Sequence, residues 1–313
     1  MAFKVEISDK EIFPVVYLRN DEERSSAEIY SFGALLNAFK INNSINIIDG
    51  FGSPQDAKDN ITKGFRSAKL NPYVCRVTNG EYTFKEHQYK IGKFFLGEEA
   101  IHGLLYDAVF SIIDSGATND EAFVTLQYQY NNKNEGFPFE YKCTINYSLQ
   151  KNNSITLTTS VENYSDLEMP ICDGWHPYFT LHAKINELIL QLNANKMLEF
   201  SRKLVPTGKI VSYIRFQKPE IFDNTFLDNC FLLNENNKPA CVLKNTTSGL
   251  ELTIKPDNSY PYLQLYTPEH RNSIAIENLS AAPNAFNNKI GLKILKPKEE
   301  ASFKTTYSVS IKS

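Results

Sequence analysis

Residues 121–161 read EAFVTLQYQYNNKNEGFPFEYKCTINYSLQKNNSITLTTSV, and this stretch decides the fold. Apolar and polar residues alternate in three runs separated by the turn-forming clusters NNKNEG and KNNS. The positions that share one face are Val124, Leu126, Tyr128 and Tyr130, then Tyr141, Cys143, Ile145, Tyr147 and Leu149, then Ile155, Leu157, Thr159 and Val161. Successive side chains of a strand point to opposite faces, so the alternation predicts three half-buried strands. Their short connections predict antiparallel pairing.

The same alternation recurs in the second half of the chain. It is found in LELTIKP (250–256), in YLQLYTP (262–268) and from Phe303 to Ile311, while EYTFKEHQYKI (81–91) after Asn79-Gly80 indicates a hairpin. The best helix candidate is the short stretch 54–65, so parallel β-α-β architecture is disfavoured. We predict an all-β fold, a large antiparallel β-sandwich, with residues 1–313 as one domain because no linker or repeat divides them.

Composition limits the kinds of partner. Lys and Arg total 33 and Asp and Glu total 36, so no basic field favours nucleic acid or an anionic membrane, and a neutral or weakly charged small ligand is expected. No apolar run approaches the roughly 20 residues that cross a bilayer, and the N-terminus lacks a signal-peptide pattern. We expect a cytoplasmic protein. Its cysteines, predicted to be reduced core residues, are Cys75, Cys143, Cys172, Cys230 and Cys241.

His176 has unusual neighbours. In ICDGWHPYFTL it lies between Trp175, the only tryptophan, and the run Pro177-Tyr178-Phe179. These aromatic residues suggest a rigid wall against which a sugar ring stacks, with the imidazole held as donor or acceptor. A core histidine with locally satisfied nitrogens is the alternative.

Glu277 ends the apolar run Ile274-Ala275-Ile276. A carboxylate among apolar walls has a raised pKa and suits general-base catalysis, whereas a strand-end carboxylate in solvent is the alternative. Three weaker candidates are His102 before a glycine, Asp228, which also fits a turn at the start of a strand, and Arg76, which also fits an exposed strand.

Together these segments resemble the aldose 1-epimerase (galactose mutarotase-like) family, in the order that the family uses. The resemblance runs from about residue 27 to the C-terminus and is carried by FRSAKLNPYVCRVTNGEYTF, IHGLLYD, VENYSDLEMPICDGWHPYFTL, LDNCFLL and YLQLYTPEHRNSIAIENLSAAPNAFNN. The most specific parts are GWHPYF and the end of the last segment. The resemblance implies the galactose mutarotase-like supersandwich and an isomerase that interconverts the α and β anomers of a hexose, with no cofactor and no metal.

The resemblance also implies a role for each candidate. His176 resembles the general acid of the family and Glu277 its general base, and His102 resembles a second histidine that orients the substrate. Arg76 and Asp228 resemble residues that bind sugar hydroxyls. Cys75, where galactose mutarotases usually carry Asn, and Pro177, where a small residue is common, are departures that leave the preferred sugar open.

The mechanism sets a condition on protonation. A base takes the proton of the anomeric hydroxyl while an acid protonates the ring oxygen, so a carboxylate and an imidazolium must coexist near neutral pH. We therefore expect the pKa of His176 to be raised or that of Glu277 to be lowered relative to the working pH, through their mutual attraction across the sugar.

Three other functions fit the sequence. One is a non-catalytic carbohydrate-binding protein. A hexose-6-phosphate 1-epimerase would need cations for the phosphate, and Lys63, Arg66 and Lys69 lie near Arg76 in sequence. A metal-dependent isomerase would use His102, His176 and Glu277 as ligands, but their wide spacing disfavours it. The oligomeric state is not indicated by any pattern.

Overall fold

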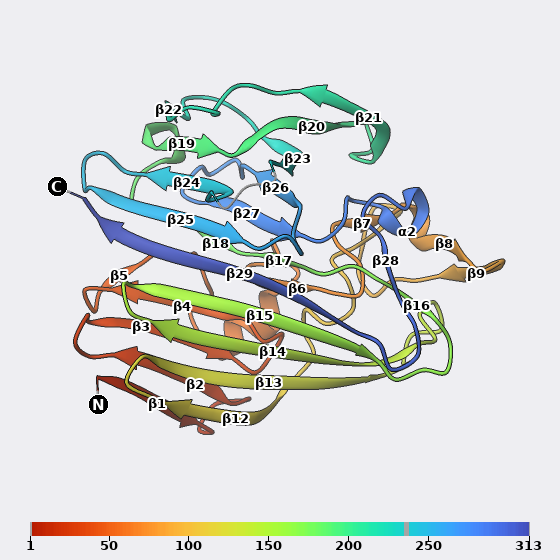
Figure 1. Ribbon diagram of the computed structural model, residues 1–313, viewed down its shortest axis with the longest axis horizontal. Helices are drawn as coiled ribbons and strands as arrows, with labels where there is room; N and C mark the ends of the chain where they lie inside the picture. Colours follow the sequence, from red (N-terminus) through yellow and green to blue (C-terminus); the bar gives the residue numbers. More distant parts are fainter. Residues whose placement is uncertain (1, 235–237, 313) are drawn as a thin grey trace.

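The structure is a computed structural model that describes residues 2–234 and 238–312. Strands dominate it, and the strand pairs of its two largest sheets are antiparallel (Figure 1). The predicted all-β class and antiparallel pairing are confirmed. That residues 1–313 form one domain stays a prediction.

A nine-stranded sheet forms the front layer in Figure 1. In spatial order its strands are β12 (Ser111–Ala117), β13 (Glu121–Asn131), β14 (Glu140–Gln150), β15 (Ser154–Asn163), β29 (Glu300–Ile311), β25 (Leu250–Pro256), β24 (Cys241–Lys244), β19 (Ile189–Leu192) and β22 (Glu220–Ile221). The three strands predicted within residues 121–161 are β13, β14 and β15, and they are consecutive neighbours in the sheet. Their alternating burial matches the alternation of the sequence.

An eight-stranded sheet lies behind the front layer. It contains β21 (Pro206–Ser212), β20 (Ala194–Phe200), β23 (Asp228–Leu233), β26 (Tyr262–Tyr266), β27 (Ile274–Leu279), β17 (Gly174–His176) and β6 (Ala68–Leu70), and β18 (Tyr178–Phe179) also pairs with β27. Aromatic side chains join the layers. The Trp175 ring meets Tyr147 of β14 at 6.0 Å between centroids, and Phe179 meets Tyr307 of β29 at 5.2 Å. The layers therefore share one sandwich core.

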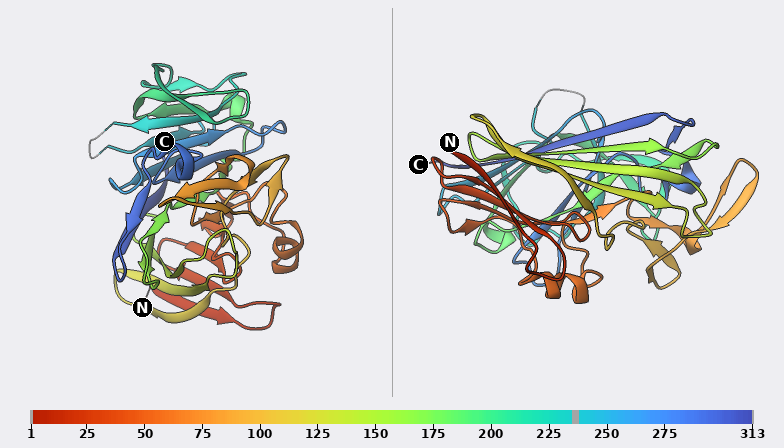
Figure 2. Two further views of the ribbon diagram at one scale, coloured as in Figure 1. Left: turned by 90° about the vertical axis from the view of Figure 1, so that its right-hand side faces the viewer. Right: turned by 90° about the horizontal axis from the view of Figure 1, so that it is seen from below.

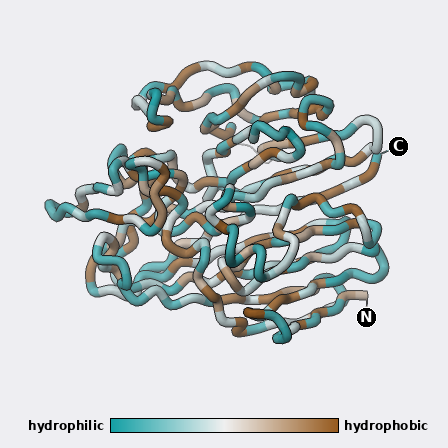
Figure 3. Tube along the Cα trace, turned by 180° about the vertical axis from the view of Figure 1, so that it is seen from behind, coloured by the Kyte–Doolittle hydropathy of each residue, from teal (hydrophilic) through white to brown (hydrophobic). Residues whose placement is uncertain are grey.

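A five-stranded sheet completes the second layer and contacts β12, β13 and β14 (Figure 2). Its strands are β1 (Phe3–Ser8), β2 (Val15–Asn20), β3 (Ser25–Tyr30), β4 (Leu36–Ile41) and β5 (Ile45–Asn46). Hydrophobic and hydrophilic stretches change over short distances along the strands in Figure 3, as expected when each strand has one buried face.

Smaller elements lie at one end of the sandwich, at the right of Figure 1. They are the sheet β10 (Phe95–Leu96), β11 (Glu99–Ile101) and β7 (Arg76–Val77), the pair β16 (Met169–Ile171) and β28 (Lys293–Leu295), and the hairpin of β8 (Glu81–Phe84) and β9 (His87–Lys90). That hairpin was predicted. The helical elements are α1 (Pro54–Asn60), α2 (Ala285–Asn288), η1 (Thr78–Gly80) and η2 (Ile185–Glu187).

Helix α1 occupies the first part of the stretch 54–65 predicted to be helical. Ser53 caps it by accepting a hydrogen bond from the amide of Asp56 at 3.1 Å, and proline stands in the first turn, where its missing N–H costs nothing. All five cysteines are buried and free, as predicted. Within the described ranges, no helix is long and apolar enough to cross a membrane.

Candidate active site

One cavity of about 430 Å³ collects all five candidate residues. Its lining includes Arg76, His102, His176, Asp228 and Glu277. These residues come from strands and loops that are far apart in sequence and that the fold brings together. The predicted grouping in space is therefore present, and it lies where the eight-stranded sheet meets the small sheet of β7, β10 and β11.

Strand alternation explains why His176 and Glu277 face the same cavity. In β17 the side chain of Trp175 points toward the nine-stranded sheet, so that of His176 points the other way. In β27 Asn278 accepts a hydrogen bond from Thr305 of β29 at 2.8 Å, so Glu277 also points away from the front layer. His176 Nε2 lies 3.4 Å from Glu277 Oε1. The acid and base candidates are thus in direct contact.

Both side chains are deeply buried, at 5% exposure for His176 and 2% for Glu277. This excludes the alternative of a solvent-facing Glu277. Glu277 Oε2 and His176 Nδ1 are buried without a hydrogen-bond partner among the residues described. Buried polar atoms are normally paired, so a locally satisfied core histidine does not describe His176.

Burial controls the protonation of the pair. Desolvation raises the pKa of Glu277 well above its ordinary value; the nearby Asp228 raises it further, and Arg76 opposes the rise. Desolvation lowers the pKa of His176 to about 4. A contact at 3.4 Å would favour the ion pair, but the loss of water around each group outweighs it. In the free protein both shifts are therefore opposite to those expected across a bound sugar, and the expectation for the sugar-bound site stays a prediction.

His102 is held beside His176 by an unusual backbone. Its amide donates to the carbonyl of Cys75 at 2.8 Å, and its ring meets that of His176 edge to face at 4.9 Å. Its φ of +62° is left-handed, and Gly103 follows with φ +76°. A Cβ on Gly103 would lie 2.4 Å from the carbonyl oxygen of Asn71, so only glycine fits there. Gly103 after His102 therefore allows this loop to pass close to the backbone of Asn71.

Arg76 and Asp228 line the cavity near its buried pair. Arg76, in β7, is half-buried and donates from Nη1 to the carbonyl of Lys203 at 3.0 Å. Asp228 is the first residue of β23, and its Oδ1 accepts from Gln264 Nε2 at 2.8 Å. Burial raises the pKa of Asp228, whereas Arg76 and the bond from Gln264 lower it.

Sequence reasoning missed Gln264. It is directly opposite Glu277 in the register of β26 and β27, lines the cavity, and has an Oε1 that is buried without a partner in the described residues. The signal was present in YLQLYTP, where Gln264 is the polar residue between Leu263 and Leu265 and must face away from the core.

The predicted aromatic wall is correct only in part. Tyr178 lines the cavity and stacks on the His176 ring at 5.2 Å between centroids. Trp175 and Phe179 face the other side of the sheet and pack against the front layer. Adjacent residues of a strand cannot share a face, so Trp175 cannot form the same wall as His176.

The cation cluster considered for a phosphate is not assembled. Lys69 is fully buried on the core side of β6 and forms an ion pair with Asp173 at 2.6 Å. Arg66 Nη1 donates to the carbonyl of Gly50 at 3.1 Å, and Lys63 is exposed. The proposal that these residues share a phosphate is therefore wrong for Lys69, which strand alternation directs into the core.

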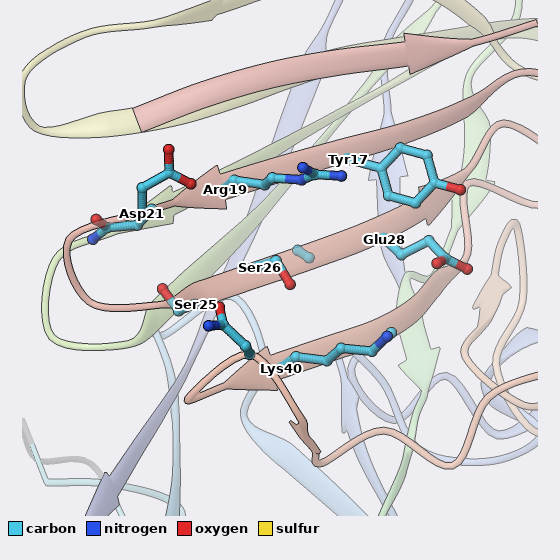
Figure 4. Close-up of a pocket in the computed structure, with 11 residues that line it drawn as sticks. Tyr17, Arg19, Asp21, Ser25, Ser26, Glu28 and Lys40 are labelled. Carbon is cyan, nitrogen blue, oxygen red and sulfur yellow. The ribbon is translucent and has the colours of Figure 1, made fainter. Parts of the chain in front are cut away.

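A second hollow, of about 310 Å³, lies on the outer face of β2, β3 and β4 (Figure 4). Tyr17, Arg19 and Glu28 lie over it, but no histidine lines it. It therefore offers no counterpart of the His176 and Glu277 pair. Over the described ranges, no group of three or more His, Cys, Asp or Glu residues is arranged to hold a metal ion.

The fold and the site together define an antiparallel β-sandwich that buries a histidine and a carboxylate in contact within one cavity. The aldose 1-epimerase family model matches residues 14–308. The chain belongs to the aldose 1-epimerase family.

The chain is also similar to two other proteins. The chain is 26% identical over 235 residues to the uncharacterized protein YihR of Escherichia coli, covering 72% of this chain and 73% of that protein. It is 22% identical over 251 residues to the bifunctional protein GAL10 of Kluyveromyces lactis, covering 73% of this chain but 36% of that protein.

Solved structures share the fold. A galactose mutarotase-like protein from Clostridium acetobutylicum has a TM-score of 0.86 at 19% identity, over 99% of this chain and 98% of that one. The galactose 1-epimerase of Lactobacillus acidophilus has a TM-score of 0.83 at 20% identity, over 98% and 99%. The predicted galactose mutarotase-like sandwich is confirmed.

Proposed function

We propose that this protein is a hexose mutarotase in which His176 and Glu277 act as general acid and general base. The observation that carries the proposal is their contact at 3.4 Å within the cavity. The two oxygens that exchange protons in mutarotation are bonded to the same anomeric carbon, so the catalytic groups must be neighbours. Two groups on adjacent strands meet that need.

The reaction is a balanced exchange of protons. Glu277 takes the proton of the anomeric hydroxyl while protonated His176 gives its proton to the ring oxygen, and the bond between the anomeric carbon and the ring oxygen breaks. The open-chain aldehyde rotates about its first carbon–carbon bond. Ring closure on the other face returns one proton from Glu277 to the former carbonyl oxygen and the other from the sugar hydroxyl to His176.

The directions of the pKa shifts set how reactive each group is in its charged form. A raised pKa makes Glu277 a stronger base, and a lowered pKa makes protonated His176 a stronger acid. Both transfers of the ring-opening step therefore become more favourable. The environment favours a protonated Glu277 beside a neutral His176, which is the state of the site while the open-chain sugar is bound.

Four polar residues have room to hold the sugar. Arg76 has further N–H donors beyond the one used on Lys203, and Gln264 Oε1 is an unused acceptor in the described part of the chain. Asp228 and His102 also line the cavity. We assign substrate binding to these four side chains.

The test is the relaxation of freshly dissolved α-D-glucose and α-D-galactose, followed by polarimetry. We expect the protein to accelerate the relaxation of at least one sugar in proportion to its concentration. A protein that binds either sugar without accelerating its relaxation would be a carbohydrate-binding protein, which contradicts the proposal. Acceleration confined to glucose 6-phosphate would favour the phosphosugar alternative.

A further inference from the structure

Strand β7, which carries Arg76, is an edge strand of two residues. On one side it pairs with β11, where Ile101 lies opposite Arg76 and Ala100 lies opposite Val77. Over the described ranges, no strand pairs with its other side. A segment with so few ladder bonds opens easily, because local stability depends on the backbone bonds that protect it. The position of Arg76 therefore depends on what binds the free side of β7.

Asn284 binds that free side. Its backbone amide donates to the carbonyl of Arg76 at 2.9 Å, and its side-chain Oδ1 accepts from the amide of Thr78 at 3.1 Å. Val77 between them is extended, with φ −126° and ψ 119°, so the carbonyl before it and the amide after it point to the same side. Asn284 therefore takes the place of a neighbouring strand, with its side-chain oxygen used as a backbone carbonyl would be.

The conformation of Asn284 aims both of these groups. Its φ is +62° and its ψ is 26°, in the left-handed region that asparagine adopts more readily than most residues. Asn284 is 6% exposed, and its Oδ1 also accepts from Asn287 Nδ2 at 2.8 Å. Its own carbonyl accepts from the amides of Asn287 and Asn288 at 2.9 and 3.0 Å, at the start of α2. The acceptor that binds Thr78 is therefore held in place.

The segment that ends at Asn284 also carries Glu277. Between the two residues, Ser280 is fixed to the eight-stranded sheet, since its amide donates to the carbonyl of Asp173 at 2.8 Å and its Oγ accepts from the Asp173 amide at 2.8 Å. Asn284 thus joins the small sheet, through the backbone of Arg76, to the strand of Glu277. Arg76 and Glu277 both line the cavity, whereas Asn284 lies outside its lining.

We propose that Asn284 is a positioning residue, which fixes the backbone of Arg76 relative to Glu277 so that the guanidinium faces the bound sugar. The inference rests on the proposed function, in which Arg76 binds the substrate, and adds to it a residue that acts from outside the cavity. The head of Arg76 is restrained by the carbonyl of Lys203, and its backbone by Asn284. A displacement of about 1 Å in such a group costs up to about 100-fold in activity.

The test begins with Asn284→Gly, which removes the Oδ1 acceptor, keeps the backbone amide and adopts φ +62° without strain. We expect kcat/KM for the better of D-glucose and D-galactose to fall about 10- to 100-fold, mainly through a higher KM, because sugar binding is weakened. Asn284→Asp keeps an acceptor oxygen and should restore most of the loss. Asn152→Gly is the matched control, since Asn152 is exposed and also has φ +62°.

A double-mutant cycle separates positioning of Arg76 from a general loss of structure. Asn284→Gly, Arg76→Ala and their combination are compared with the wild type in kcat/KM and in sugar affinity by calorimetry. Once the Arg76 side chain is truncated, Asn284→Gly has no guanidinium left to displace, so the double variant should match Arg76→Ala. Thermal melting checks folding. If the glycine variant does not fold, Asn284→Ser replaces it in the cycle, because its shorter side chain withdraws the acceptor from Thr78.

Each outcome decides the inference. Losses that multiply in the double variant overturn it, as does a folded Asn284→Gly with wild-type kcat/KM and affinity, or an Asn284→Asp as impaired as Asn284→Gly. If the wild type accelerates the relaxation of neither sugar, the proposed function fails, but sugar affinities that show the same coupling still support positioning of Arg76 by Asn284. Binding of neither sugar overturns both.

Discussion

Two buried pairs of titratable residues lie on opposite faces of the same sheet. Lys69 and Asp173 face the sandwich core, and His176 and Glu277 face the cavity. Lys69 Nζ contacts Asp173 Oδ1 at 2.6 Å and Thr159 Oγ1 at 3.0 Å, and it lies 4.2 Å from the Trp175 ring centroid. Both pairs are buried. They differ in how many of their polar atoms form hydrogen bonds.

Asp173 is saturated with partners. Its Oδ1 also accepts from Tyr260 at 2.6 Å, and its Oδ2 accepts from Asn71 at 3.0 Å. By contrast, Glu277 Oε2 and His176 Nδ1 have no partner among the described residues. A saturated buried pair holds strands together, whereas unsatisfied atoms lining a cavity are positioned for a ligand. This difference separates a structural pair from a candidate catalytic pair.

The largest expected effect is on catalysis at the unsaturated pair. We expect His176→Asn and Glu277→Gln each to lower kcat for mutarotation by about 10²- to 10⁴-fold, because each removes one proton-transfer group. Polarimetry of the purified variants measures this loss. Thermal melting checks that they are folded.

Exposed residues of the same types provide the controls. His182→Asn and Glu269→Gln change an exposed histidine and an exposed glutamate, and both should keep wild-type turnover. Wild-type turnover by either cavity variant would remove that residue from the mechanism.

A substitution in the saturated pair of Lys69 and Asp173 should lower the free energy of unfolding. Lys69→Met leaves the Asp173 carboxylate buried without its cation, and we expect a loss of about 3–5 kcal/mol in the free energy of unfolding. Denaturant melts measure it. Lys69→Met combined with Asp173→Leu should recover part of the loss, since no lone charge remains. If Lys69→Met were as stable as the wild type, the Lys69–Asp173 pair would not stabilise the fold, which would contradict its description as a structural pair.

The pH dependence of stability sharpens the comparison. Burial depresses the pKa of His176 from 6.5 to about 4, so its contribution to stability is present above pH 6.5 and is lost as the pH falls toward 4. This loss amounts to about 3 kcal/mol. We expect His176→Asn to flatten the stability curve between pH 6.5 and 4, in urea melts at each pH. His182→Asn should leave the slope unchanged.

The fold could be predicted because alternation is a local signal. Within residues 121–161 the alternation predicts which side chains are buried, and the turn clusters predict which strands are paired. The sequence therefore predicts β13, β14 and β15. The order of strands that are distant in sequence does not follow, since it depends on packing across layers. β29 pairs with both β15 and β25, and no local pattern indicates those neighbours.

The candidate site was predicted residue by residue but not as a geometry. His176 and Glu277 stand out in their segments, and the family resemblance supplied their grouping. The partner of Lys69 could not be found from spacing, because Asp173 lies in a distant segment and the two meet only when β6 pairs with β17. The bonds of Asn284 to β7 gave no signal either, since they are set by the tertiary structure.

The smallest effect we expect is a gain in stability at the candidate base. Burial raises the pKa of Glu277, so the folded state disfavours its ionised form, and this cost grows as the pH rises through the folded pKa. Glu277→Gln keeps the shape and removes the charge, and we expect it to raise the free energy of unfolding by about 0.5–2 kcal/mol at pH 8. At pH 4, where the carboxyl is protonated in the folded protein, the gain should vanish. Urea melts at both pH values measure the difference, with Glu269→Gln as the exposed control. A variant less stable than the wild type at pH 8 would mean that Glu277, like Asp173, serves the fold.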